Sequence, residues 1–310
     1  MSILFYCSDD ADNRILAALK TGLPNHDIAV WPHCNDKASI NTAIVWQPPD
    51  NFFNDLVNLK HILSISAGVD HLLAHPGLPN GIDIVRLIDA GMAQPMAQFI
   101  LYGVLHAQRQ MNALAQAQRN KQWRHDLGPR PAEQFHVGIM GAGQLSLVAA
   151  QKLLGNGYRV SCWSRSDKQL GNIAHFTGNQ GLDELLPSVN VLVCLLPLTV
   201  ETHGILDAAL LSKLPDNAFL INPGRGDHLD EQALLNELNA GRLSGALLDV
   251  FTTEPLPSSH PFWTHPNVVV TPHVAAPTDA SGSVTQIVES LQLLERGEKP
   301  RGLVNREVGY

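Results

Sequence analysis

Short apolar runs rich in Ile, Val and Leu recur along the first third of the chain, separated by stretches with helix-like spacing. The apolar runs lie at residues 3–6, 28–31, 43–46, 62–65 and 82–87, and the helix-like spacing is found at 10–20 and 51–59. Near-continuous apolar strands that alternate with helices are typical of a parallel sheet covered on both faces. This part of the chain is therefore predicted to form a doubly wound α/β unit.

A second series of apolar runs follows at residues 136–140, 159–163, 191–195, 218–222, 245–249 and 268–271. It predicts a second unit of the same kind, so the fold class is α/β with two doubly wound parallel-sheet domains. Long helical patterns at 94–119 and 278–296 are candidates to cross between the domains. Hinges are expected near residues 91–95 and 275–277.

The stretch 231–240 carries helix signals at both ends. Asp230 precedes it, where a carboxylate can accept the free N–H groups of the first turn. Gly241 follows it, where the left-handed conformation that ends many helices favours glycine. A helix is predicted between these two residues.

Composition and charge narrow the class of protein and of partner. Hydrophobic residues make up 45% of the 310 residues and charged residues 16%, which is a balance typical of a folded globular protein. The formal net charge is −8, so the overall field does not favour nucleic acid or an anionic membrane as a partner. An anionic ligand would have to be held by local arginines, backbone N–H groups and helix N-termini.

The cysteine pattern bears on the compartment. Cys7, Cys34, Cys162 and Cys194 form no C-x-x-C pair, which favours reduced thiols. The first seven residues lack the basic region of a signal peptide, and the longest apolar run, 191–198, is too short to span a membrane. The prediction is a cytoplasmic protein without a membrane partner.

A metal site is not predicted. Among the 14 histidines, His260, His265 and His273 lie close together in the sequence but lack metal-ligand spacing. No thiolate or carboxylate cluster accompanies them.

The candidate chemistry begins after the strand at 136–140. That strand leads into Gly141-Ala142-Gly143-Gln144-Leu145-Ser146 and then into a helical stretch, which is the order of a dinucleotide-binding turn. Gly141 permits the tight turn, and Gly143 lets a pyrophosphate approach the helix N-terminus beside Gln144 and Leu145. Alone, the pattern leaves open a bare glycine turn or a methyltransferase-like site.

The end of the next strand bears on the choice of nucleotide. An NAD site usually has a carboxylate there for the ribose 2′-hydroxyl, whereas this strand ends in Ser164-Arg165-Ser166. Two hydroxyls and a guanidinium suit a 2′-phosphate, so NADP is the predicted cofactor and NAD the alternative. Asp167 follows directly and weakens this preference, and an exposed polar loop is the other interpretation.

Three charged residues each follow one of three successive predicted strands. Arg225 lies in Asn222-Pro223-Gly224-Arg225-Gly226-Asp227, Glu254 in Asp249-Val250-Phe251-Thr252-Thr253-Glu254-Pro255, and His273 in Thr271-Pro272-His273-Val274-Ala275-Ala276. Open α/β sheets hold their ligands at the carboxyl ends of the strands. Each residue alone has an ordinary structural explanation, but their order behind a dinucleotide turn favours a catalytic site.

With these motifs the chain resembles the D-isomer-specific 2-hydroxyacid dehydrogenase family, and within it the glyoxylate/hydroxypyruvate reductases of the A group. Further segments carry the resemblance along almost the whole chain: Ala43-Ile44-Val45-Trp46-Gln47-Pro48-Pro49, Ser66-Ala67-Gly68-Val69-Asp70, Leu196-Pro197-Leu198-Thr199-Val200-Glu201-Thr202 and Gly309-Tyr310. The resemblance implies a Rossmann-type cofactor domain, 97–276, inserted in a flavodoxin-like substrate domain, 1–96 and 277–310. It also implies a homodimer. The apolar spacing of the helix at 96–111 does not itself distinguish a core contact from a dimer contact.

The resemblance also assigns roles to residues. Arg225 would bind the substrate's carboxylate and keto oxygen, His273 would be the acid/base, and Glu254 would orient it. The loop Ala67-Gly68-Val69 would hold the carboxylate through N–H groups, with Trp46 near the substrate. Pro197 and Thr199 would line the cofactor, and Asp249 would approach the nicotinamide amide. Two departures from the family pattern are Ser146, in place of a glycine, and Pro223-Gly224 before the arginine, which is expected to loosen Arg225.

The implied activity is NADPH-dependent reduction of glyoxylate and hydroxypyruvate to glycolate and D-glycerate. The residues support it independently, because reducing a 2-keto acid needs a proton donor and cations or N–H groups at the carboxylate and keto oxygen. Two alternatives stay open: a dehydrogenase for another 2-keto acid, of the phosphoglycerate or D-lactate type, and a non-enzymatic NAD(P)-sensing regulator.

Overall fold

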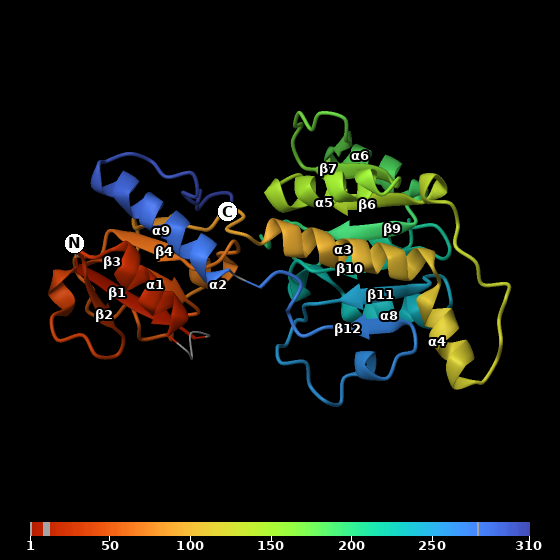
Figure 1. Cartoon of the computed structure of the whole chain (residues 1–310), viewed down its shortest axis with the longest axis horizontal. Coiled ribbons are helices and arrows are strands. Elements are labelled where there is room, and N and C mark those ends of the chain that lie inside the picture. The colour runs from red at the N-terminus through yellow and green to blue at the C-terminus, as the bar shows by residue number, and fades with distance from the viewer. Residues whose placement is uncertain (1, 9–12, 278) are drawn as a thin grey trace. The chain divides into compact units, whose positions relative to one another are not determined.

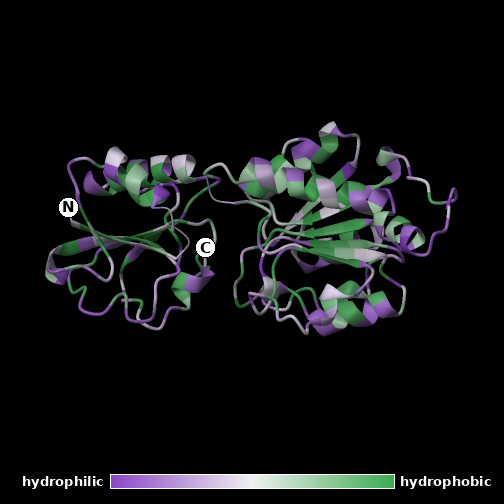
Figure 2. Cartoon of the chain, turned by 60° about the horizontal axis from the view of Figure 1, so that its bottom comes forward, coloured by the Kyte–Doolittle hydropathy of each residue, from purple (hydrophilic) through white to green (hydrophobic). Residues whose placement is uncertain are grey.

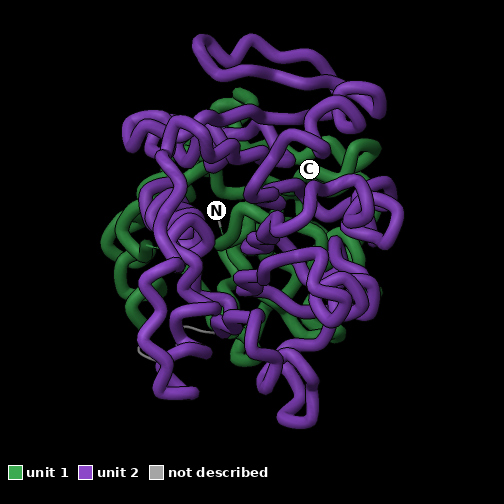
Figure 3. Tube along the Cα trace, turned by 90° about the vertical axis from the view of Figure 1, so that its right-hand side faces the viewer, with its two compact units in different colours: residues 1–91, 278–310 green, residues 92–277 purple. Residues whose placement is uncertain are grey.

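The computed structural model describes residues 2–8, 13–277 and 279–310 and divides the chain into two compact units. Unit 1 comprises Met1–Gly91 and Thr278–Tyr310, and unit 2 comprises Met92–Pro277 (Figure 3). The first boundary lies five residues before the predicted one, because the helix that begins at Ala93 packs against another helix of unit 2. The second boundary lies one residue after the predicted one.

Unit 1 contains a five-stranded parallel sheet in the order β2-β1-β3-β4-β5 (Figure 1). Its strands are β1 (Ser2–Cys7), β2 (Asp27–Val30), β3 (Ile40–Trp46), β4 (His61–Ser64) and β5 (Asp83–Val85). Its helices are α1 (Arg14–Gly22), α2 (Asp70–Leu73), α9 (Ala280–Glu295) and the short η1 (Lys37–Ser39), and α1 packs against α9. The predicted starting points at residues 10 and 278 lie outside the described residues.

The helix predicted at 51–59 is wrong, because this segment forms successive turns. Its helix-like spacing reflects burial of the side chains of Phe52, Phe53, Leu56 and Leu59. Asp55 adopts a left-handed backbone with φ 67°, which interrupts any helix. The apolar spacing therefore indicated the core-facing side of the segment but not its conformation.

Unit 2 contains a seven-stranded parallel sheet in the order β12-β11-β10-β9-β6-β7-β8. Its strands are β6 (His136–Met140), β7 (Arg159–Ser164), β8 (Ala174–Thr177), β9 (Val191–Cys194), β10 (Phe219–Asn222), β11 (Gly245–Leu248) and β12 (Val268–Val270). The strand order reverses between β6 and β9, and ligands of open α/β sheets bind at such a switch point.

Helices cover both faces of this sheet. They are α3 (Ala93–Gln108), α4 (Met111–Arg119), α5 (Gln144–Gly155), α6 (Gly178–Leu185), α7 (Ala208–Leu211) and α8 (Glu231–Asn239), with short turns η2 (Ala132–Gln134), η3 (Leu186–Ser188), η4 (Gly226–His228) and η5 (Pro261–Trp263). One apolar cluster joins the sheet to α3 and α5, and another joins it to α6, α7 and α8. Figure 2 shows the strands as hydrophobic segments between helices with mixed faces.

The helix predicted over 94–119 is two helices, α3 and α4, because Gln110 between them has φ 55°. The edge strand β8 was not predicted, since Ala174 is exposed and its other three residues are only partly buried. The capping prediction at α8 is confirmed: the Asp230 carboxylate accepts from the Ala233 N–H at 2.9 Å, and Gly241 has φ 72°. Among the described residues, no helix is both long and apolar enough to span a membrane.

Candidate active site

The candidate residues of unit 2 lie in loops that follow strands at one edge of its sheet. Because all seven strands are parallel, their carboxyl ends share this edge. The ends of β6, β7 and β9 and the loops that follow them hold the candidates for cofactor binding other than Asp249, which follows β11. The loops after β10, β11 and β12 hold Arg225, Glu254 and His273. One half of this edge therefore carries most of the candidates for nucleotide binding, and the other half carries the candidates for catalysis.

The glycine turn after β6 has the geometry that a dinucleotide site needs. Gly141 has φ 128°, and a Cβ there would lie 2.7 Å from the carbonyl oxygen of Leu195, so other residues are excluded. Gly143 caps α5 without a side chain, and a Cβ there would meet open space. The N-terminus of α5, with exposed Gln144 and half-buried Leu145, is thus open to an anion. These residues fit a dinucleotide's pyrophosphate.

Ser146, which stands where the fingerprint has its last glycine, is buried beneath this turn. Its hydroxyl oxygen would lie 2.9 Å from a Cβ placed on Gly141. The serine thus fills the space under the glycine turn and does not protrude from it.

The end of β7 presents two cations. Arg165 and Ser166 are exposed, and the Lys168 ammonium donates to the Ala142 carbonyl oxygen of the glycine turn at 3.3 Å. The Ser164 hydroxyl is buried and bonded to the Ser166 carbonyl oxygen and to His175 Nε2, both at 2.8 Å. Lys168 was not among the predicted site residues, because its approach to the glycine turn depends on how the loop folds back.

The loop after β9 holds Pro197 and Thr199 in a tight turn. The Thr202 hydroxyl donates to the Pro197 carbonyl oxygen at 2.7 Å and accepts from the Thr199 N–H at 2.8 Å. The Thr199 hydroxyl donates to Glu201 Oε2 at 2.9 Å. The Thr202 hydroxyl therefore holds the backbone of residues 197–202 in this turn.

The turn after β10 carries Arg225. The Asn222 side-chain amide donates to the Arg225 carbonyl oxygen at 3.0 Å, and the guanidinium donates to the Gly224 carbonyl oxygen at 2.9 Å. Gly226 lies against the backbone of Phe251, so that any Cβ there would clash. The turn is thus packed directly on the loop that carries Glu254.

Glu254 and His273 form a hydrogen-bonded pair. His273 Nδ1 donates to Glu254 Oε2 at 2.8 Å, and the Phe251 N–H donates to Glu254 Oε1 at 3.0 Å. The bond from His273 uses Nδ1, so Nε2 is the ring nitrogen that can transfer a proton to a substrate. His273 has φ 54°, a left-handed conformation that is uncommon for residues other than glycine and that occurs at functional sites.

The charges around this pair set its protonation. The hydrogen bond to Glu254 raises the pKa of His273, against the effects of burial and of the nearby Arg225. Burial alone would raise the pKa of Glu254, but the bonds from His273 and the Phe251 N–H, together with the charge of Arg225, hold it below its ordinary value. The arrangement is an imidazolium stabilised by a carboxylate, beside a guanidinium.

Asp249 holds the loop that carries His273. Its carboxylate is buried; Oδ1 accepts from the Thr271 hydroxyl at 2.6 Å and the Val274 N–H at 2.9 Å, and Oδ2 accepts from the Ala275 N–H at 2.8 Å. The His273 N–H donates to the Asp249 carbonyl oxygen at 2.8 Å. The aspartate thus bonds to the loop on both sides of His273.

The remaining candidates belong to unit 1. Trp46 ends β3, and its ring packs edge-on against His71 at a centroid distance of 4.7 Å. Ala67, Gly68 and Val69 lie between β4 and α2, and the Ser66 hydroxyl donates to the Gly68 carbonyl oxygen at 2.6 Å. Trp46 and this loop thus lie at the carboxyl ends of β3 and β4, which are neighbouring parallel strands of the unit 1 sheet.

Across residues 2–8, 13–277 and 279–310, no three His, Cys, Asp or Glu side chains gather to hold a metal ion. Burial raises the pKa of the Cys162 and Cys194 thiols to about 12, so neither is a thiolate near neutral pH.

Fold and site together define an α/β protein whose second unit carries a dinucleotide-type glycine turn and, at the same edge of its sheet, an arginine, a glutamate and a histidine. A family model described as the NAD binding domain of D-isomer specific 2-hydroxyacid dehydrogenase matches residues 101–275. Curated relatives named glyoxylate/hydroxypyruvate reductase A, from Yersinia enterocolitica and Serratia proteamaculans, are each 41% identical over the whole of both chains.

Solved structures of related proteins are similar to this chain over its whole length. A D-isomer specific 2-hydroxyacid dehydrogenase from Xanthobacter autotrophicus, in complex with NADPH and MES, is similar with a TM-score of 0.94 and 37% identity over 100% of this chain and 99% of that chain. An NADPH-dependent glyoxylate/hydroxypyruvate reductase from Sinorhizobium meliloti, in complex with NADP and sulfate, is similar with a TM-score of 0.92 and 34% identity over 100% of this chain and 99% of that chain. The chain belongs to the D-isomer-specific 2-hydroxyacid dehydrogenase family of oxidoreductases, as its motifs predicted.

Proposed function

We propose that the protein reduces glyoxylate and hydroxypyruvate to glycolate and D-glycerate with NADPH. The observation that carries the proposal is the His273–Glu254 bond of 2.8 Å at the same sheet edge as Arg225 and the glycine turn. Relatives that bear the name of this activity are identical to the chain at 41% of positions over their whole length, which supports the choice of substrate.

The chain's own residues would perform the proton and charge chemistry. When bound, NADPH supplies a hydride to the carbonyl carbon. The Arg225 guanidinium binds the substrate's carboxylate and keto oxygen, and His273 Nε2 gives a proton to that oxygen as negative charge develops on it. Glu254 keeps the imidazole protonated and oriented, so the raised pKa of His273 suits a proton donor in the reductive direction.

NADPH is the proposed cofactor because cations gather where the ribose would lie. Arg165 and Ser166 are exposed at the end of β7, and Lys168 reaches the glycine turn. Neighbouring structures from three organisms contain NADPH or NADP, which supports this choice. Pro197, Thr199 and the glycine turn would line the same nucleotide, with unit 2 as the cofactor domain.

Unit 1 carries two further candidates for substrate binding. We assign the N–H groups of the loop Ala67-Gly68-Val69 to the substrate's carboxylate, with Trp46 near the substrate. The bond between Ser66 and Gly68 gives this loop a defined path, which supports such a role.

A spectrophotometric screen tests the proposal. Purified protein is mixed with NADPH or NADH and a panel of glyoxylate, hydroxypyruvate, pyruvate and phosphohydroxypyruvate, and nucleotide oxidation is followed. The highest kcat/KM is expected for glyoxylate and hydroxypyruvate with NADPH. A preference for pyruvate or the phosphorylated acid would assign a sister dehydrogenase activity, and tight nucleotide binding without turnover would assign a sensor.

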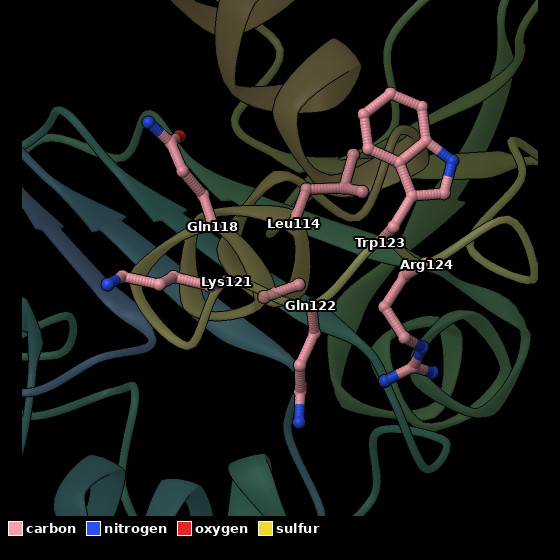
Figure 4. A pocket seen from close by; sticks show the side chains of 7 residues that line it. Leu114, Gln118, Lys121, Gln122, Trp123 and Arg124 are labelled. Atoms are coloured by element: carbon pink, nitrogen blue, oxygen red, sulfur yellow. The ribbon is translucent and has the colours of Figure 1, made fainter.

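A homodimer is also proposed. Large apolar side chains of α3, α4 and the segment that follows are exposed: Tyr102, Leu105, Met111 and Trp123, the last by 86%. Trp123 lies beside Leu114 at a hollow of about 460 Å³ (Figure 4). These exposed groups favour a second copy as their cover. Light scattering should give twice the mass of the chain, and Trp123→Ala should shift the equilibrium towards monomer.

A cytoplasmic location is the last element of the proposal. None of the four cysteines, all of which the structure describes, forms a disulfide bond, which is usual in reducing compartments. Fractionation of cells that produce the protein should recover it with cytoplasmic markers.

A further inference from the structure

His228 is a buried histidine that neither the motifs nor the chemistry above explains. It ends η4 and has no exposed surface. Its ring lies between the turn that carries Arg225 and the loop that carries Pro197 and Thr199. Nδ1 accepts from the Arg225 N–H at 3.3 Å, and Nε2 donates to the Pro197 carbonyl oxygen at 3.3 Å.

The partners of the ring define its protonation state. A backbone N–H can only donate, so Nδ1 must be an unprotonated acceptor towards Arg225. A carbonyl oxygen can only accept, so Nε2 must carry the proton. Only the neutral ring with its proton on Nε2 satisfies both partners. The Cys194 thiol, 3.6 Å from Nδ1, can act only as a further donor to it.

The backbone reinforces this connection. The Gly204 N–H donates to the Asp227 carbonyl oxygen at 2.7 Å, and the Leu206 N–H donates to the His228 carbonyl oxygen at 2.8 Å. The chain that leads away from the Pro197 loop is therefore paired with the chain that leads away from Arg225. The imidazole adds side-chain hydrogen bonds between the same two segments.

The glycine before Arg225 makes room for the ring. A Cβ on Gly224 would lie 3.3 Å from His228 Nδ1 and 3.0 Å from the Cys194 carbonyl oxygen. The imidazole thus fills the space that Gly224 leaves in the turn. We expected Pro223-Gly224 to loosen Arg225, and in the structure the fully buried side chain of His228 packs against this turn.

We propose that His228 is a positioning residue that couples the substrate-binding arginine to the cofactor loop through its two ring nitrogens. This inference rests on the proposed function for the roles of Arg225 and Pro197. Nδ1 holds the backbone N–H of Arg225 on the substrate side, and Nε2 holds the carbonyl oxygen of Pro197 on the cofactor side. Loss of either bond should therefore disturb one ligand more than the other.

Two conservative substitutions separate the bonds. His228→Asn places an amide oxygen near the position of Nδ1 and removes the group at Nε2, whereas His228→Gln places an amide N–H near the position of Nε2 and removes the acceptor at Nδ1. With one net hydrogen bond lost in each, we expect His228→Asn to raise the dissociation constant and KM of NADPH by about 3- to 10-fold, with the KM of glyoxylate almost unchanged. His228→Gln should raise the KM of glyoxylate by about the same factor and lower kcat, with NADPH binding almost unchanged.

A matched control accounts for general loss of stability. His136 is also a buried histidine with both ring nitrogens bonded, but it lies at the amino end of β6. Its Nδ1 bonds to the Ser188 carbonyl oxygen at 3.1 Å and to the Ser188 hydroxyl at 3.2 Å, and its Nε2 bonds to the Ser161 hydroxyl at 2.8 Å. His136→Gln should lower the melting temperature without moving either KM. NADPH binding is measured by fluorescence titration without substrate, so this readout does not depend on turnover.

The outcomes are distinct. Nitrogen NMR of the wild-type ring should show a neutral imidazole protonated on Nε2, and His228→Asn and His228→Gln should move opposite parameters. A ring protonated on Nδ1, or equal changes of both parameters in both variants, would overturn the inference. If the wild type reduces no 2-keto acid, the proposed function fails, whereas the ring tautomer and the NADPH titrations still decide the role of His228.

Discussion

Replacing Asp249 with asparagine should destabilise unit 2 and slow turnover, because the carboxylate holds the His273 loop with both oxygens. An asparagine that keeps its amide oxygen at Oδ1 retains the bonds to Thr271 and Val274. Its NH₂ group then faces the Ala275 N–H, where Oδ2 accepted at 2.8 Å. With the side chain 1% exposed, water cannot satisfy the two opposed donors.

The expected loss of stability follows from these opposed N–H donors. A buried donor left unsatisfied costs about 1–3 kcal/mol. For a domain of 150–250 residues, each kcal/mol lowers the melting temperature by about 2–4 °C, so a fall of roughly 2–12 °C is expected. Release of Ala275 would let the loop that carries His273 move, so kcat should fall while the KM of NADPH changes little.

Thermal unfolding of the ligand-free protein, alongside steady-state kinetics, tests this reasoning. The isosteric change alters charge and donor pattern without altering volume, so a cavity contributes nothing to the result. An unchanged melting temperature together with a raised KM for NADPH would refute the anchoring role. It would instead support a direct contact of Asp249 with the nicotinamide amide.

Three further predictions concern the ligands. His273→Ala should lower kcat by about 10²–10⁴-fold, the range typical of general acid catalysis, while NADPH titrations give a nearly unchanged dissociation constant. Arg225→Lys should raise the KM of glyoxylate and lower kcat, since an ammonium cannot span carboxylate and keto oxygen; kinetics equal to wild type would place Arg225 outside the site. Arg165→Ala should raise the KM of NADPH by about 10-fold, the lower end of a charge-assisted contact because the side chain is exposed, and leave NADH unaffected. Arg165→Asp should reverse the nucleotide preference, whereas a parallel loss with both nucleotides in Arg165→Ala would indicate stacking on adenine.

The parallel strands were predictable because their residues face apolar helices on both sides of the sheet. The strand at 136–140 was predicted with its observed bounds, since all five residues are buried. The edge strand β8 was not, because Ala174 is exposed and the other three residues are only partly buried. The break between α3 and α4 depends on the left-handed backbone of Gln110, which its residue type does not signal.

At the site, the sequence indicated which residue types lie at strand ends but not what their side chains contact. Ser164 matched the pattern of a phosphate ligand, yet its hydroxyl bonds to His175, which belongs to the unpredicted strand β8. Asp249 matched the position of a cofactor contact, yet both its oxygens hold the next loop. His228 is one of 14 histidines, and only the pairing of two distant loops distinguishes it from the others.

The pH dependence of NADPH-driven glyoxylate reduction, in the wild type and in Glu254→Gln, tests the central claim most directly. His273 must be protonated to donate, and its pKa is raised, so kcat/KM should be highest below that pKa and fall as pH rises through it. A neutral amide at position 254 removes the main cause of the raised pKa, so the fall should occur at lower pH in the variant. Coincident pH profiles for the two proteins would contradict the account, because Glu254 would then have no part in setting the protonation of His273.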